Sequence, residues 1–150
     1  MPHLVILYSG NLDKAPADGG TDMRGLCRAL ADAMLTVRDE QDKQVFPTGG
    51  ARVLAYPAAH WAIADGGAAG EAAGKGGDYA FVYLNLRMGR GRSPEVHQRA
   101  GSTLEAVVRQ HFAEQLQRRP IGLTLQIDEG PELYDAKVSS LHPLFASQKN

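Results

Sequence analysis

Two near-continuous apolar runs constrain the fold of this chain more than any other feature. They are HLVILY at residues 3–8 and DYAFVYLNLRM at residues 78–88. Apolar residues on both faces are typical of strands that are covered on both sides, as in a parallel or mixed sheet. Each run is followed by a helix-like segment and a further strand, so the chain is predicted to contain two strand–helix–strand units.

The first unit is predicted to span about residues 2–63. Its helix is indicated by apolar residues every three or four positions, namely Met23, Leu26, Leu30, Met34 and Val37. Thr21 or Asp22 can cap the start of this helix. Residues 53–56 predict the second strand, and Pro57 is expected to interrupt or end its pairing because proline lacks an N–H.

The second unit is predicted to span about residues 78–128. Its helix is expected to begin with Ser93 as the N-cap and Pro94 at the first helical position, and to close at QRRP, residues 117–120. Residues 121–128 alternate apolar and polar side chains, which predicts a strand with one buried face.

Together the units predict a single α/β domain (α+β by some schemes) over residues 1–150. Each unit should hold parallel strands with a right-handed crossover, giving a four-stranded sheet with two helices on one face. Because apolar side chains occur on both faces, subunit association is expected to cover the other face. The Gly-rich link 66–77 is expected to be a mobile loop, and the LHPLF segment of the tail 129–150 is expected to dock on the domain.

Composition excludes several function classes. Sixteen Lys plus Arg against seventeen Asp plus Glu leave a net charge of −1, so neither nucleic acid nor a membrane is an expected partner. The one cysteine, Cys27, cannot form an internal disulfide and is expected to pack in the core. With no apolar stretch near the roughly 20 residues of a membrane span, we expect a cytoplasmic protein.

The sequence gives no sign of a metal or phosphate site. The five histidines include no pair spaced i, i+4 on a helix, so no metal is expected. The Gly-rich link does not match a P-loop, because Ala69 stands at the first glycine position and Gly76 at the last position.

Pro2 has two interpretations. A proline is tolerated at the first residue of a strand, where its missing N–H is not needed. If Met1 is removed, as aminopeptidases generally do before small residues, Pro2 becomes a free secondary amine that can act as a base. The residues alone leave both interpretations open.

The segment GRGRS before the second helix carries Arg90 and Arg92 and is a candidate anion site. A helix N-terminus presents unpaired N–H groups, and guanidinium groups match the geometry of carboxylates. The alternative is that arginines in a glycine turn are simply solvated. Arg52, at the entrance of a strand, has the same two interpretations.

Seven segments in order along most of the chain resemble the 5-carboxymethyl-2-hydroxymuconate isomerases of the tautomerase superfamily. They are PHLVILYSGN, FPTGGARV, HWAIADG, DYAFVYLNLRMGRGRS, QRAG, HFAEQ and LHPLF. The resemblance implies a homotrimer of paired β-α-β units that acts without a cofactor in aromatic compound catabolism. It also implies that Pro2 is the catalytic base and that Arg52 and Arg92 bind a small carboxylate-bearing enol and assist catalysis. Arg90, which departs from the family pattern, adds a cation beside Arg92 and is a further candidate for substrate binding.

The implied reaction moves one proton from the 2-hydroxyl of a dienol to a remote carbon, which gives the conjugated ketone. An amino-terminal amine titrates at about 7.7 to 8.0 in model peptides, and burial or a neighbouring arginine lowers that pKa. A neutral Pro2 amine could therefore serve as the base, while the arginines spread the charge of the enolate.

Two alternatives remain. Leu7 stands where relatives often carry an acidic residue, the glycine-rich link is long, and Arg90 adds a cation. Because of these departures, one alternative is a tautomerase that acts on another enol acid, such as a phenylpyruvate-like enol. From a different class, the chain could be a non-catalytic trimer that binds a small carboxylate, which retention of Met1 would favour.

Overall fold

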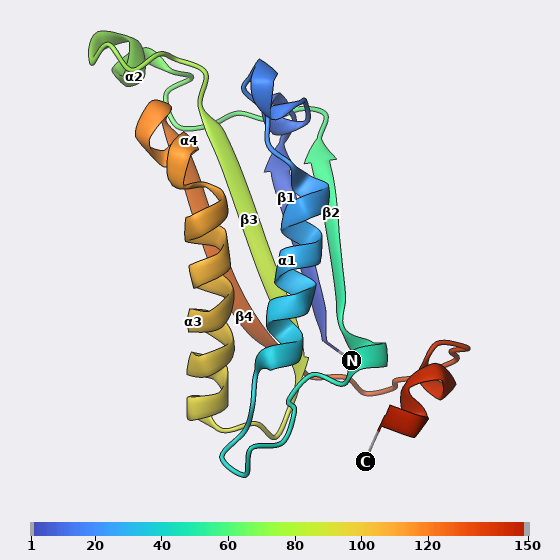
Figure 1. Cartoon of the computed structure of the whole chain (residues 1–150). Coiled ribbons are helices and arrows are strands. Elements are labelled where there is room, and N and C mark those ends of the chain that lie inside the picture. Colours follow the sequence, from blue (N-terminus) through green and yellow to red (C-terminus); the bar gives the residue numbers. More distant parts are fainter. Residues whose placement is uncertain (1, 149–150) are drawn as a thin grey trace.

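Strand β1 (His3–Ser9) is an inner strand of a four-stranded sheet with the order β2-β1-β3-β4 (Figure 1). The other strands are β2 (Arg52–Ala58), β3 (Ala80–Gly89) and β4 (Ile121–Gly130). The structure, a computed structural model, describes residues 2–148. Met1 lies outside the described residues, so its removal stays a prediction.

The two predicted strand–helix–strand units are confirmed. β1 and β2 pair in parallel, β3 and β4 pair in parallel, and β1 joins the units by antiparallel pairing with β3. The main helices are α1 (Met23–Thr36) and α3 (Pro94–His111), and they lie side by side over the same face of the sheet (Figure 1). This is the α+β architecture of two β-α-β units with the helices on one face.

The core lies between this pair of helices and the sheet. Every second residue of β1 and β3 faces the helices and is buried, which follows from the two-residue period of a strand. Completely buried side chains in this layer include Leu4, Ile6, Leu26, Leu30, Leu84, Leu86 and Leu104. Cys27 is half-buried against this core, and burial raises the pKa of its thiol.

Capping side chains define the start of both helices. The carboxylate of Asp22 accepts a hydrogen bond from the Gly25 N–H at 2.8 Å, and the Ser93 hydroxyl accepts one from the Val96 N–H at 3.2 Å. The predicted second helix is interrupted at Phe112, whose ring is completely buried and whose backbone leaves the helical region. A short helix, α4 (Ala113–Arg118), follows.

Pro57 does not interrupt its strand, contrary to the expectation. β2 continues through Pro57 to Ala58, and Pro57 pairs with Tyr8. The reason is that β2 is an edge strand, where a missing N–H is tolerated.

Part of the Gly-rich link is helical rather than an irregular loop. Helix α2 (Ala68–Ala72) forms within it, away from the start of β1 (Figure 1). The Asp65 carboxylate accepts hydrogen bonds from the N–H groups of Gly67 and Ala69, and the Tyr79 hydroxyl accepts one from Gly70. These local bonds hold a segment that composition alone suggests is featureless.

The tail after β4 crosses the end of the sheet and finishes in a 3-10 helix, η4 (His142–Gln148). η4 packs on another 3-10 helix, η3 (Thr48–Gly50), just before β2. A Cβ atom at Gly49 would come within 3.0 Å of the Phe145 ring, so the two segments are in close contact. The LHPLF segment therefore contacts the domain through Phe145, while the side chains of Leu141 and Leu144 stay more than half exposed.

The sheet face opposite the helices is open in the single chain. Large apolar side chains on it are about half exposed, namely Leu7, Leu54, Tyr56 and Phe81. An apolar face of this kind is typical of a surface that another subunit covers. Among residues 2–148, no helix is both long and apolar enough to cross a membrane.

Replacing Leu84 with alanine should lower the free energy of unfolding by about 2–5 kcal/mol, because this completely buried side chain would leave a cavity. The matched control is Leu133→Ala in the tail, whose side chain is fully exposed and which should change stability by less than about 0.5 kcal/mol. Chemical denaturation of both variants measures the difference. Equal effects would contradict the placement of the core.

Candidate active site

Pro2 is buried at the foot of β1, next to a pocket of about 270 Å³. The residues lining this pocket are Pro2, Pro47, Gly89, Arg92, Glu132, Asp135 and Lys137. They come from four separate parts of the chain: the start of β1, the segment before β2, the end of β3 with its following turn, and the tail. The pocket therefore forms only when both units and the tail have folded.

Arg92 reaches the pocket from the turn between β3 and α3. Gly91 in that turn has φ of 92°, a conformation that favours glycine, and Ser93 caps the helix. Arg92 Nη1 donates a hydrogen bond to the Gly89 carbonyl at 2.7 Å, so the half-buried guanidinium is anchored on one side. Because a guanidinium has five N–H donors, others can bind an anion.

Arg52 begins β2 directly beside His3, the first residue of β1. Its Nη1 donates to the Gly50 carbonyl at 3.4 Å, and the strand register puts Arg52 on the same sheet face as His3 and Arg87. Arg90 is exposed in the β3–α3 turn. The structure thus brings Pro2 and Arg92 to one pocket, whose described lining includes neither Arg52 nor Arg90.

His3 and Arg87 form a basic group with Arg52 that the sequence analysis missed. Burial lowers the pKa of His3, and the positive charges of Arg52 and Arg87 lower it further. His3 is therefore largely neutral at pH 7. The strand register could have revealed this group, because His3 and Arg52 begin their strands and Arg87 lies near the carboxyl end of the antiparallel β3, which is the same end of the sheet.

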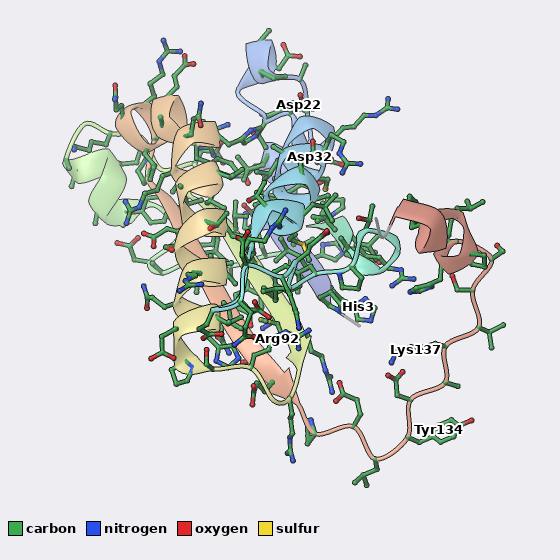
Figure 2. The ribbon with its side chains drawn as sticks, turned by 60° about the horizontal axis from the view of Figure 1, so that its bottom comes forward. His3, Asp22, Asp32, Arg92, Tyr134 and Lys137 are labelled. Carbon is green, nitrogen blue, oxygen red and sulfur yellow. The ribbon has the colours of Figure 1, made fainter. Side chains whose placement is uncertain are left out.

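The tail supplies the other pocket residues that the sequence analysis missed. Lys137 Nζ lies 3.0 Å from an Asp135 carboxylate oxygen, and Arg87 Nε lies 3.6 Å from a Glu132 carboxylate oxygen. Figure 2 shows Lys137 on the tail and Arg92 beyond the end of β3, while Tyr134 points outward. The hydrogen bond from Lys137 lowers the pKa of Asp135, so that carboxyl is ionised at neutral pH.

Comparisons with known proteins show which family the chain belongs to. The family model described as "CHMI: 5-carboxymethyl-2-hydroxymuconate isomerase" matches residues 2–145. The chain belongs to this family. The resemblance stated from the seven sequence segments is confirmed.

Individual relatives of the isomerase family give the same result. A crystal structure of a 5-carboxymethyl-2-hydroxymuconate delta-isomerase is 64% identical, with a TM-score of 0.90 over 97% of this chain and 93% of that chain. The 5-carboxymethyl-2-hydroxymuconate Delta-isomerase of Escherichia coli is 28% identical over 97% of this chain and 99% of its own length. A fused 4-OT wild type symmetric trimer shares the fold at 16% identity, with a TM-score of 0.54 over 92% of each chain.

Two of the larger hollows away from Pro2 adjoin α3. One of about 730 Å³ runs between α3 and the edge strand β4 and is lined by apolar residues such as Leu123 and Leu125. The other, of about 450 Å³, lies beside His111, whose Nε2 is 2.9 Å from the Thr21 hydroxyl. Burial lowers the pKa of His111, consistent with a neutral histidine that helps to close the core. Neither hollow is lined by both Pro2 and an anion-binding side chain, as the smaller pocket is.

The described residues contain no group of three or more His, Cys, Asp or Glu side chains that could hold a metal ion. The pocket beside Pro2 is lined instead by the proline itself, by the guanidinium of Arg92 and by the ammonium of Lys137. These groups can bind carboxylates and move a proton.

Proposed function

We propose that this protein is a cofactor-independent isomerase that converts 5-carboxymethyl-2-hydroxymuconate, or a closely similar dienol, to the conjugated ketone. The observation that carries the proposal is that Pro2 and Arg92 line the same pocket in a chain of this isomerase family. The pocket has a volume of about 270 Å³, enough for a small acid, and Pro2, Pro47, Gly89 and Arg92 reach it from the two β-α-β units.

In the proposed reaction, the Pro2 nitrogen takes the proton of the 2-hydroxyl group. The O–H bond breaks, the C–O bond becomes a carbonyl, the C2=C3 double bond moves to C3=C4, and the electron pair of the former C4=C5 double bond is left to bind a proton at C5. The same nitrogen then returns the proton to the remote carbon, where a C–H bond forms. One group suffices because the proton that leaves oxygen is matched by the proton that reaches carbon, and no oxidant or cofactor is needed.

This chemistry requires that the mature protein begin at Pro2. In that form the nitrogen is a secondary amine, whereas an amide nitrogen behind Met1 has no basic lone pair. An amino-terminal amine ordinarily titrates at about 7.7 to 8.0, so part of the population is neutral at physiological pH. The burial of Pro2 beside an arginine supports a role as a proton carrier rather than as a solvated chain end.

Arg92 is proposed to hold a substrate carboxylate and to stabilise the negative charge that develops on the enolate oxygen. Such preorganised donors are most effective where water is partly excluded. Arg52 is proposed to contribute from the adjacent strand. Its position on the sheet face with His3 and Arg87 gives it a place in an assembled site, because that face is the one expected to meet another subunit.

We propose that the protein assembles as a homotrimer. The support is the open apolar sheet face of the single chain, together with a fold shared with a symmetric trimer. Burial of Leu7, Leu54 and Tyr56 against other copies would remove apolar surface from water.

The variant Pro2→Ala should lose about 10²- to 10⁴-fold in kcat/KM, the range typical of a general acid–base group. The measurement is the decay of the ultraviolet band of the dienol, with mass spectrometry to establish that the protein begins at residue 2. Pro47→Ala is the matched control, since Pro47 lines the same pocket but carries no free amine. A Pro2→Ala protein with full activity would exclude Pro2 as the base, and a fully active form that keeps Met1 would do the same.

Arg92→Gln should lower kcat by about 10²- to 10³-fold, the loss seen when a donor to a developing oxyanion is removed. Arg90→Gln is the comparison, because Arg90 lies two residues away but is exposed and outside the described pocket lining. We expect the loss from Arg90→Gln to be much smaller. If the two variants lose activity equally, the binding role assigned to Arg92 from its position is wrong.

A further inference from the structure

The geometry points to Lys137 as a residue that determines specificity: its ammonium group binds a carboxylate of the substrate that the arginines do not hold. This inference rests on the proposed function and deepens it. It predicts that the enzyme favours enols with several carboxylates over enols with one.

The proposed substrate carries several negative charges. A muconate is a diacid, and a carboxymethyl substituent adds a third carboxylate. Each carboxylate that leaves water without a positive partner costs free energy. Arg52 and Arg92 provide two cations, so a third is needed to match the three carboxylates.

Lys137 is the remaining cation of the pocket. Of the described residues that line it, the basic ones are Arg92 and Lys137. Arg92 enters from the β3–α3 turn and Lys137 from the tail, so the two positive groups reach the pocket from different segments (Figure 2). A substrate with carboxylates at separate positions could contact both at once.

Lys137 is paired with Asp135 within the tail. The distance between Lys137 Nζ and the Asp135 carboxylate is 3.0 Å, and the lowered pKa of Asp135 shows that the carboxyl stays ionised. An ammonium has three N–H donors, so one can bond to Asp135 while another binds a substrate carboxylate. The Lys137 side chain is 52% exposed, which leaves it accessible to a ligand that enters from solvent.

The acidic residues of the pocket do not cancel this role. Glu132 is paired with Arg87 at 3.6 Å, and Asp135 is paired with Lys137 itself. Arg87 lies outside the described pocket lining but neutralises Glu132, so three basic groups, Arg87, Arg92 and Lys137, face the two acidic groups of the lining, and the net charge around the pocket remains favourable for an anion. The tail around these pairs is otherwise lightly held, since Leu133 and Val138 are fully exposed.

The test measures steady-state kinetics of Lys137→Met with two substrates, the tricarboxylate 5-carboxymethyl-2-hydroxymuconate and the monocarboxylate enol of phenylpyruvate. With the tricarboxylate, we expect KM to rise about tenfold or more while kcat stays within about twofold, as for loss of a charged hydrogen bond that serves binding. With the monocarboxylate, neither constant should change. Lys137→Arg should retain most of the affinity for the tricarboxylate.

Lys75→Met is the matched control, because Lys75 is exposed in the Gly-rich link away from the pocket, and it should change nothing. Asp135→Asn separates binding from a purely structural role. If Lys137 only ties down the tail through Asp135, then Asp135→Asn and Lys137→Met will cause equal losses with both substrates. That result overturns the inference, as does an unchanged KM of Lys137→Met for the tricarboxylate.

A wild-type protein that turns over neither substrate would refute the proposed function without deciding the role of Lys137. Calorimetric titration with tricarballylate, an unreactive tricarboxylate, then decides it. Weaker binding by Lys137→Met than by wild type supports the inference, and equal binding or no binding by wild type overturns it.

Discussion

The pairing of β1 on both of its edges is the constraint on which the rest of the structure depends. β2 holds one edge in parallel and β3 holds the other in antiparallel register, so the start of β1 cannot move independently of the sheet. Pro2 therefore occupies a defined and buried position rather than a loose chain end. A proline is well suited to this place, because it heads the strand without needing an N–H.

The topology of the sheet brings the other pocket residues close to Pro2. The antiparallel pairing of β1 with β3 brings the end of β3 and the following turn, with Arg92, to the start of β1. Because β3 and β4 pair in parallel, both strands end at the same end of the sheet. The tail that follows β4 therefore also begins there. The tail carries Lys137, which lines the pocket although it lies outside both β-α-β units. Substrate preference could thus vary with the tail while the fold stays the same.

Local patterns were enough to predict the units, the cap at Ser93 and the approximate strands, because these depend on local burial and capping. For the first helix they left Thr21 and Asp22 open as the cap, and the structure has Asp22. Local patterns could not predict that Pro57 stays paired, since that depends on β2 being an edge strand. The candidate base and Arg92 could be named from the sequence and the resemblance. Lys137 could not, because the tail has no repeating pattern and its path is set by tertiary contacts.

The central claim is that substrate binds in the pocket formed by Pro2 and Arg92. The most direct measurement is a crystal structure of the protein beginning at Pro2 with bound tricarballylate. We expect one carboxylate on the Arg92 guanidinium and the carbon chain in contact with the Pro2 nitrogen. Ordered ligand seated instead in the apolar hollow between α3 and β4, with the Pro2 pocket empty, would contradict it.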